Sequence, residues 1–177
     1  MRIISGKYKG KVLKEYNIEG TRPTMDRVKE SLFGIIQNNV RDSICLDLFC
    51  GSGNLGIEAL SNYAKECYFV DKNKKIIDIL KKNTLDIEGV FLINDDFKNA
   101  LNNFKIKFDI IFLDPPYDMM LINDAIELIE KKDLLNENGL IICEYTKEKI
   151  ISNYDLIKEK RYGDKYIKIF KNNKKNH

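Results

Sequence analysis

The tetrapeptide Asp114-Pro115-Pro116-Tyr117 is the part of the sequence whose residue types point most directly to a reaction. It follows an apolar run, 108–113, and holds two of the three prolines in the chain. Each proline fixes its φ angle and lacks an N–H donor, so the neighbouring carbonyl oxygens are held rigidly with no donor beside them. The carboxylate of Asp114 adds another acceptor, and Tyr117 offers a flat face on which a base can stack. Rigid paired acceptors suit an –NH2 group, which has two hydrogens to donate.

The exocyclic amine of a nucleobase is the group that such acceptors would activate. Its nitrogen is a poor nucleophile because the lone pair is delocalised into the ring, and acceptors on both hydrogens favour a pyramidal nitrogen with a freer lone pair. When that nitrogen takes up a methyl group it becomes positive, and Asp114 would stabilise the charge where it develops. The base must leave its stack to reach such a pocket. The alternative for this tetrapeptide is a rigid turn that carries a surface tyrosine.

Three glycines, Gly51, Gly53 and Gly56, form a G-x-G-x-x-G pattern between a predicted strand and a predicted helix. Glycines at this point let the backbone turn tightly and approach a ligand. Asp71 lies 20 residues after Gly51, at the end of the next predicted strand, where its carboxylate can accept hydrogen bonds from ribose hydroxyls. This pattern fits either a dinucleotide or S-adenosylmethionine.

Asp47 favours the second of these ligands. It precedes Gly51 by four residues, at the strand end and within an otherwise apolar run, where it would repel a pyrophosphate and attract an amine or a sulfonium. The alternative for Asp47 is a partner for a helix N-terminus or a loop cap. After the third apolar run, Asp96 and Phe97 can hold an adenine amino group and ring, although Asp96 is equally suited to cap the next helix.

The elements that must position these residues alternate along the chain. Apolar runs predict strands at 44–49, 67–70, 90–93, 108–113 and 140–143, and helical patterns fall at 54–63, 73–86, 96–103 and 119–131. Such alternation predicts βαβ units and a parallel sheet that is buried on both faces. The runs 155–160 and 166–170 predict an antiparallel pair that completes a seven-stranded, mostly parallel sheet with helices on both faces.

The first 40 residues are predicted to extend this domain. The runs 2–5 and 10–14 predict a small β-hairpin, and a helix is expected over 25–38 with Thr24 as its N-cap. The chain is thus expected to form one α/β domain, with an extension over 1–40, a core over 41–171 and an unstructured tail over 172–177.

Composition excludes several kinds of protein. Of the 177 residues, 44% are hydrophobic and 32% charged, as in an ordinary globular domain. No apolar run is 18 residues long, and lysines interrupt the N-terminal segment, so neither a membrane span nor a signal peptide is expected. The only histidine is His177, which removes Ser-His-Asp and Cys-His catalysis and histidine-ligated metals. The four cysteines lack zinc spacing and predict reduced thiols in a cytoplasmic protein.

Charge is distributed unevenly along the chain. Residues 1–30 hold eight Lys or Arg against four Asp or Glu, and residues 158–177 hold eight against two, while the whole chain has a net charge of only +3. The two basic ends therefore flank an acidic centre. Basic segments of this kind favour contact with a polyanion such as nucleic acid, and the alternative is that they only keep the protein in solution.

With these residues assembled, the sequence resembles the class I S-adenosylmethionine-dependent methyltransferases. More narrowly, it is similar to the bacterial guanine-N2 methyltransferases of small-subunit (16S) ribosomal RNA, of the RsmD type. The motifs that carry the narrower resemblance are 2–6 (Arg-Ile-Ile-Ser-Gly) with Gly10-Lys11, 22–33 (Arg-Pro-Thr-Met-Asp-Arg-Val-Lys-Glu-Ser-Leu-Phe), 46–53 (Leu-Asp-Leu-Phe-Cys-Gly-Ser-Gly) and Asp114-Pro115-Pro116-Tyr117. The resemblance covers residues 1 to about 170.

The resemblance implies a Rossmann-like domain and a role for each group of residues. Those implied to bind S-adenosylmethionine are Asp47, Phe49, Gly51, Gly53, Asp71, Asp96 and Phe97. Those implied to act in catalysis are Asp114, Pro115, Pro116 and Tyr117. Those expected to face the RNA are Arg2, Lys7, Lys9, Lys11, Arg22, Thr24 and Arg27. Ribosomal RNA, either bare or within an assembling small subunit, is the expected partner of a monomeric protein.

Rival functions stay open at this stage. The tetrapeptide serves any planar –NH2, so an adenine-N6 or cytosine-N4 methyltransferase acting on DNA or another RNA is the first alternative. A cytosine-C5 methyltransferase is excluded, because its thiolate nucleophile usually follows a proline and no Pro-Cys occurs here. A NAD-linked dehydrogenase would leave Asp47 and the tetrapeptide unexplained. A non-catalytic RNA-binding assembly protein would have no need of the tetrapeptide.

Overall fold

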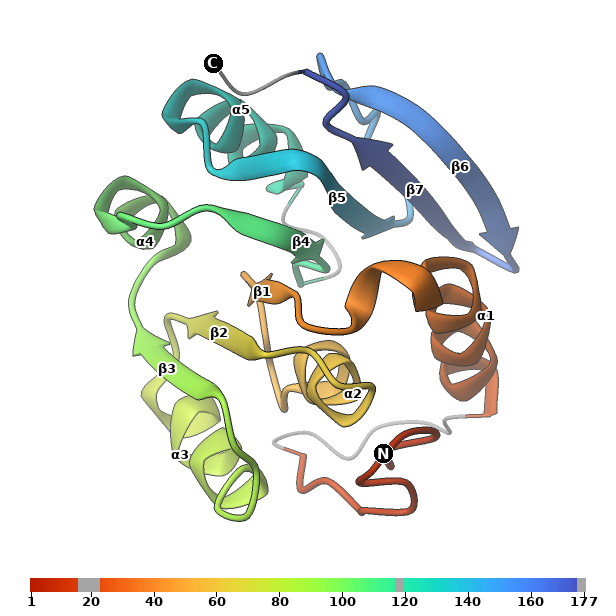
Figure 1. Cartoon of the computed structure of the whole chain (residues 1–177), viewed down its shortest axis with the longest axis vertical. Coiled ribbons are helices and arrows are strands. Elements are labelled where there is room, and N and C mark those ends of the chain that lie inside the picture. The colour runs from red at the N-terminus through yellow and green to blue at the C-terminus, as the bar shows by residue number, and fades with distance from the viewer. Residues whose placement is uncertain (16–22, 117–119, 175–177) are drawn as a thin grey trace.

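The computed structural model describes residues 1–15, 23–116 and 120–174, which form a sheet with helices on both faces (Figure 1). Seven strands are ordered β3-β2-β1-β4-β5-β7-β6 across this sheet. The pairs among β1 to β5 are parallel, and β7 is antiparallel to both of its neighbours. The strands are β1 (Ile44–Asp47), β2 (Glu66–Asp71), β3 (Val90–Asn94), β4 (Phe108–Leu113), β5 (Leu135–Tyr145), β6 (Asp155–Tyr162) and β7 (Lys165–Lys171).

The helices cover the two faces unequally. One face carries α1 (Pro23–Val40), α2 (Asn54–Ser61) and α3 (Lys74–Asn83), and the other carries α4 (Phe97–Asn103) and α5 (Ile122–Lys132) (Figure 1). In β4, Ile110 and Phe112 belong to the first core and Ile111 and Leu113 to the second, because successive side chains of a strand point to opposite faces. The predicted fold class, a mostly parallel seven-stranded α/β sheet, is therefore confirmed.

The strand register brings the chemically interesting residues to one edge of the sheet. Asp47, the last residue of β1, is paired with Phe112 of β4. Two residues after Phe112 the chain reaches Asp114, and Cys143 of β5, which is paired with Leu113, is followed at once by Glu144. Because parallel strands end at the same edge, these three acids lie close together.

The N-terminal segment, residues 1–15, packs on α2 as a loop held by one antiparallel bridge between Arg2 and Val12. The two strands of the predicted hairpin are thus reduced to a single bridge, beside which the Ile3 N–H donates to the Lys11 carbonyl oxygen at 2.9 Å. Gly6 has a φ of +82°, and a Cβ there would lie 2.0 Å from the Ser61 carbonyl oxygen. Only glycine therefore lets this segment approach α2 so closely.

Several element bounds differ from the prediction, and for β5 and α1 the reason can be identified. Strand β5 begins at Leu135, five residues before the predicted run, because polar residues 136–138 interrupt the apolar pattern. Helix α1 begins at Pro23, so Thr24 lies in its first turn and is not the N-cap. A proline is well suited to the first helical position, where its missing N–H would have no partner. Helix α5 begins at Ile122 rather than at residue 119.

The prediction of an unstructured tail over 172–177 is wrong for its first residue, Asn172. Asn172 is 3% exposed, and its side-chain amide donates to the Leu135 carbonyl at 2.9 Å. Its backbone exchanges hydrogen bonds with residues 138 and 139, so the chain stays anchored beside the start of β5. Residues 175–177 lie outside the described part. Within the described part, no helix combines the length and the apolar character needed to cross a bilayer.

Candidate active site

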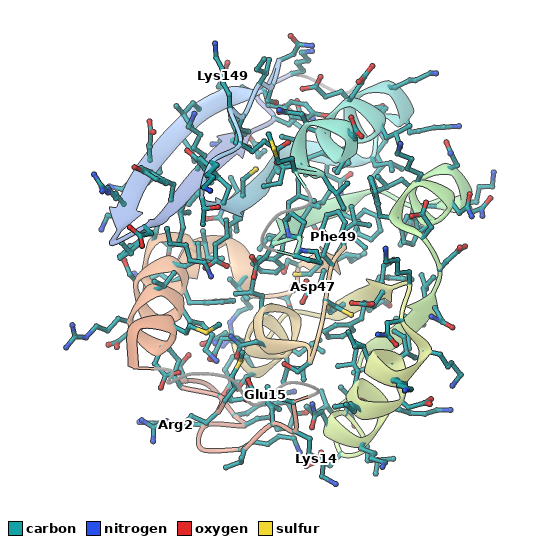
Figure 2. The ribbon with its side chains drawn as sticks, turned by 180° about the vertical axis from the view of Figure 1, so that it is seen from behind. Arg2, Lys14, Glu15, Asp47, Phe49 and Lys149 are labelled. Carbon is teal, nitrogen blue, oxygen red and sulfur yellow. The ribbon has the colours of Figure 1, made fainter. Side chains whose placement is uncertain are left out.

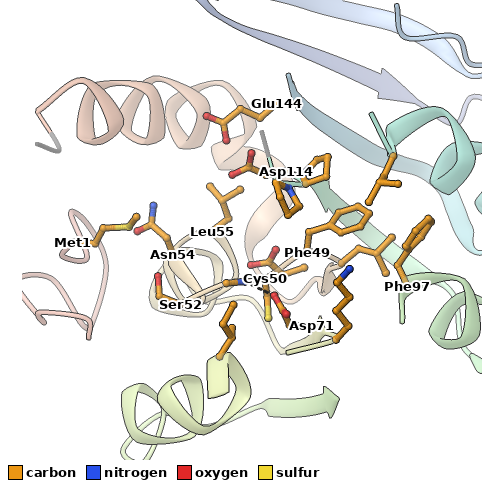
Figure 3. Close-up of a pocket in the computed structure, with 18 of the residues that line it drawn as sticks. Met1, Phe49, Cys50, Ser52, Asn54, Leu55, Asp71, Phe97, Asp114 and Glu144 are labelled. Atoms are coloured by element: carbon orange, nitrogen blue, oxygen red, sulfur yellow. Dashed lines mark hydrogen bonds between the residues drawn. The ribbon is translucent and has the colours of Figure 1, made fainter. Parts of the chain in front are cut away.

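A cavity of about 470 Å³ opens at the carboxyl ends of the central strands, where open α/β sheets bind their ligands (Figure 3). Nine of the predicted cofactor and catalytic residues line it, namely Asp47, Phe49, Gly51, Asp71, Asp96, Phe97, Asp114, Pro115 and Pro116. Gly53 does not line it, and Tyr117 lies outside the described residues. The cavity thus brings the glycine turn and the Pro-Pro turn to one space.

The glycines of the turn between β1 and α2 have different roles. Gly51 has a φ of +53° with no atom within 4 Å of a Cβ placed on it, so its backbone borders open space in the cavity. Gly53 has a φ of +90°, and a Cβ there would lie 2.4 Å from Leu80. A Cβ on Gly56 would lie 2.3 Å from the ring of Phe69 in β2. Gly51 is therefore suited to a ligand, whereas Gly53 lets the turn approach α3 and Gly56 lets α2 pack closely on β2.

Asp71 ends β2 and is fixed by the backbone around it. One carboxylate oxygen accepts from the Gly51 N–H at 3.3 Å and the other from the Asn73 N–H at 2.9 Å. A carboxylate offers about four lone-pair positions, so each oxygen can still accept a hydrogen from a ligand hydroxyl. The side chain is thereby oriented toward the cavity while it also holds the glycine turn.

Asp47 is 2% exposed and faces both a helix and the cavity. Its Oδ2 accepts from the Gly56 N–H at 3.0 Å, in the first turn of α2, so the helix-partner interpretation holds. Burial raises the pKa of Asp47 to about 7, with Asp71 and Glu144 adding to the rise and the Gly56 hydrogen bond opposing it. A nearby positive charge would strongly favour the ionised form of this buried carboxyl group.

An aromatic pair and the N-cap residue of α4 also line the cavity. The rings of Phe49 and Phe97 are 5.1 Å apart between centroids (Figure 3). Asp96 is the N-cap of α4, since its side chain accepts from the Lys98 N–H at 3.0 Å, and it also lines the cavity. Both interpretations of Asp96 are therefore compatible with its position, and the Phe pair offers an apolar surface to a flat ring.

Asp114 forms a carboxyl pair with Glu144, the residue that follows the buried part of β5. Burial raises the pKa of Asp114 well above its usual range, the neighbouring Glu144 raises it further, and Lys165 opposes the rise. The Glu144 carboxylate is 3.0 Å from the Lys165 ammonium. The negative charge of Glu144 so close by disfavours the ionised form of Asp114, which is why its pKa rises.

The charge of the cavity lining distinguishes between ligands. Six acids line it, Asp47, Asp71, Asp95, Asp96, Asp114 and Glu144, against two bases, Lys29 and Lys72. Lys29 is moreover paired with Glu58 at 2.9 Å. Such a lining attracts a cation and repels the pyrophosphate of a dinucleotide. Cys50 also lines the cavity, but burial and the nearby acids raise its pKa well above the usual range, which keeps a thiol rather than a nucleophilic thiolate.

Sequence reasoning did not single out Glu144, Lys165 or Lys29. Glu144 follows an apolar run, as Asp71 and Asp114 do, and could have been found by that signal. Lys165 and Lys29 carried no such signal, because each gains its importance from a partner that is distant in the sequence.

Those residues expected to face RNA that the structure describes lie on the N-terminal segment and α1. Lys7, Lys9 and Arg27 are exposed. Lys11 is paired with Asp86 at 2.8 Å, and Arg2 lies 3.7 Å from Asp26. Figure 2 shows Arg2 at the periphery and Asp47 and Phe49 in the interior. Arg22 lies outside the described residues, and Thr24 is described only as part of the first turn of α1.

Comparison with known proteins places the chain among relatives of similar length. The family model described as Conserved hypothetical protein 95 matches residues 1–171. "Ribosomal RNA small subunit methyltransferase D" of Haemophilus influenzae is 40% identical over 97% of this chain and 94% of its own length, and that of Escherichia coli K12 is 33% identical over 96% and 89%. The solved structure named "Putative methyltransferase yhhF" from Escherichia coli is 30% identical and covers 97% of each chain with a TM-score of 0.87.

Proposed function

This chain belongs to the Conserved hypothetical protein 95 family, and we propose that it transfers a methyl group from S-adenosylmethionine to the N2 amine of a guanine in small-subunit ribosomal RNA. One observation carries the methyltransferase assignment: the Gly51 turn and the Asp114-Pro115-Pro116 turn line the same cavity. The choice of RNA rests on the relatives, which are named for the small-subunit ribosomal RNA. The choice of guanine N2 rests on the resemblance of the N-terminal motifs.

The cavity fits the cofactor in shape and charge. Gly51 leaves open space beside its backbone, Asp71 has acceptor positions left for ribose hydroxyls, and Phe49 and Phe97 offer an apolar face for the adenine. Asp47 provides a buried negative charge for a cationic group. When bound, S-adenosylmethionine supplies an electrophilic methyl group on a sulfonium. Gly53 contributes by shaping the turn, since it does not line the cavity.

The catalytic work falls to Asp114 and the rigid turn after it. The Asp114 carboxylate and a carbonyl of the Pro-Pro turn accept the two hydrogens of the amine and orient its lone pair. Asp114 Oδ then takes the proton that the amine must lose, and a carboxyl whose pKa lies well above its usual range is a better acceptor for it than an ordinary aspartate. Tyr117 is proposed to stack on the base.

The proposal also covers how the protein contacts the RNA and in what state it acts. The basic residues of the N-terminal segment and of α1 would contact the phosphates of the RNA, either bare or in an assembling subunit, and the protein would act as a monomer in the cytoplasm. An adenine-N6 or cytosine-N4 methyltransferase is the second candidate, because the Pro-Pro turn can accept hydrogens from any planar –NH2 group. The acidic lining disfavours a NAD-linked enzyme.

The test is incubation of the protein with labelled S-adenosylmethionine and either bare small-subunit rRNA or small-subunit particles, followed by digestion to nucleosides. N2-methylguanosine is expected. N6-methyladenosine or N4-methylcytidine would replace the proposed base, and RNA binding without label would indicate a non-catalytic binder.

A matched pair of variants tests the catalytic assignment. Asp114→Ala should lower the transfer rate by about 100-fold or more and change the cofactor dissociation constant by no more than a few-fold. Asp155→Ala, an exposed acid on β6, should leave both unchanged. Loss of folding in Asp114→Ala would make that residue structural.

A further inference from the structure

A second cavity, of about 200 Å³, adjoins the larger one. Four residues line both, namely Asp114, Pro115, Pro116 and Glu144, so the two spaces meet at the Pro-Pro turn and the carboxyl pair. Lys165 lines only the smaller cavity. A ligand that reaches the larger cavity from the smaller one therefore passes between the rigid carbonyls and two acids.

Glu144 is held in place at this meeting point. Its side chain is 12% exposed, and one of its oxygens lies 3.0 Å from the Lys165 ammonium. Figure 3 shows its carboxylate next to that of Asp114 at the border of the cavity, and its charge raises the pKa of Asp114. Since Asp114 extends β4 and Glu144 ends the buried part of the adjacent β5, the backbone fixes their separation.

Two adjacent carboxylates match the edge of only one of the amine-bearing bases. Guanine presents two neighbouring donors, the ring N1–H and the N2 amine. Adenine and cytosine present a ring nitrogen acceptor beside their amine. A second carboxylate facing that ring nitrogen would therefore form a hydrogen bond with guanine and repel the lone pair of adenine or cytosine.

We propose that Glu144 accepts the N1–H of the flipped guanine while Asp114 accepts from its N2 amine, so that Glu144 selects guanine among the bases. This inference rests on the proposed methyl transfer, and it assigns the choice of base, which the Pro-Pro turn cannot make, to a residue of this chain. Lys165 orients Glu144 by occupying the oxygen that faces away from the base.

The first test uses the wild-type protein and one substituted nucleotide. The guanosine that the wild-type protein methylates is replaced by 2-aminopurine riboside, which keeps the amine at C2 but has an acceptor at N1. We expect kcat/KM to fall by about tenfold or more, since a well-placed hydrogen-bond pair to a base discriminates by that amount. Equal kcat/KM on the two RNAs would overturn the role of Glu144. Absence of methylation on unmodified RNA would instead overturn the proposed function.

The second test is the variant Glu144→Gln with both RNAs. Lys165 would hold the amide oxygen, which leaves the amide N–H2 to donate to N1 of 2-aminopurine and to oppose N1–H of guanine. We expect the ratio of kcat/KM for guanosine over 2-aminopurine to fall about tenfold or more, and 2-aminopurine to react faster than with the wild-type protein. Glu159→Gln, an exposed acid on β6, should leave the ratio unchanged.

A purely structural role for Glu144 predicts a different result. It would lower both rates by the same factor and leave their ratio unchanged, which would overturn the proposal. Thermal unfolding and cofactor binding of Glu144→Gln report whether the variant is folded. If it is not, the wild-type comparison of the two RNAs still decides the question.

Discussion

The ammonium of Lys29 lies 2.9 Å from the carboxylate of Glu58, and both side chains are buried, with 2% and 0% of their surfaces exposed. The pair joins α1, α2 and the N-terminal segment. Lys29 also donates to the Arg2 carbonyl at 2.7 Å, and Glu58 accepts the N–H groups of Ile4 and Ser5 at 3.0 and 3.1 Å. Because Lys29 and Met1 both line the cavity, this ion pair holds the segment against the candidate active site.

Replacing only the lysine of this buried ion pair should destabilise the protein strongly. Lys29→Met leaves the Glu58 charge buried without its cationic partner, which costs about 3–5 kcal/mol of unfolding free energy. The control is Lys107→Met, which removes an exposed pair with Asp133 and should produce no measurable change. Denaturant unfolding of both variants checks this. A Lys29→Met protein as stable as its parent would mean that the buried pair makes no net contribution.

Asp71 should contribute to cofactor binding rather than to the transfer step. Asp71→Ala removes the acceptors proposed for the ribose and also the partner of the Gly51 N–H, so the dissociation constant should rise by about tenfold or more. The rise should be equal for S-adenosylmethionine and S-adenosylhomocysteine, because the two share the ribose. Isothermal titration with both ligands measures it, and an unchanged dissociation constant would contradict the assignment.

The acids of the site could largely be predicted from the sequence, because a simple rule of topology applies to them. A parallel strand that is buried on both faces reads as an apolar run, and a polar residue directly after it lies at the ligand-binding edge. Asp71 and Asp114 follow this rule, and Asp47 is the last residue of β1 although apolar residues come after it. Glu144 follows it too, but it stands in no turn motif, so its role became visible only when the β4–β5 register placed it beside Asp114.

Other residues could not be assigned from the sequence for physical reasons. Lys29 lies in a helical pattern in which lysine usually covers a solvated face, and its burial depends on how α1 packs on α2. Gly53 satisfies a ligand-binding pattern, yet its missing side chain makes room for Leu80 of α3. In both positions the deciding contact joins residues about 30 positions apart, and local pattern carries no information on it.

The raised pKa of Asp47 should make the stability of the free protein depend on pH. Between its ordinary value of 3.8 and about 7 the folded protein holds a proton on Asp47 that the unfolded chain has lost. The unfolding free energy therefore decreases as pH rises through this window, by at most roughly 1.4 kcal/mol per pH unit from this group. At pH below both values Asp47 is protonated in both states and contributes no slope.

Asp47→Asn isolates that contribution, because asparagine can still accept from the Gly56 N–H but does not titrate. The unfolding free energy of the variant relative to its parent should increase from about pH 4 to about pH 7 and be constant above that range. Denaturant unfolding in the absence of cofactor at several pH values measures the difference. A difference that stays constant with pH would show that Asp47 titrates normally in the folded protein.

The exposed lysines of the N-terminal segment should contribute more to RNA binding than the lysine that is already paired with an acid. Lys7 and Lys9 are exposed, whereas Lys11 is already paired with Asp86 at 2.8 Å. Replacing Lys7 and Lys9 with Gln should weaken RNA binding and lower the slope of log affinity against log salt by up to about 0.7 per lysine, with cofactor binding unchanged. Lys11→Gln should have a smaller effect, because its charge is partly neutralised before RNA arrives. Asp86→Asn frees Lys11 and should strengthen binding, and an unchanged slope in the Lys7 and Lys9 variant would place the RNA elsewhere on the protein.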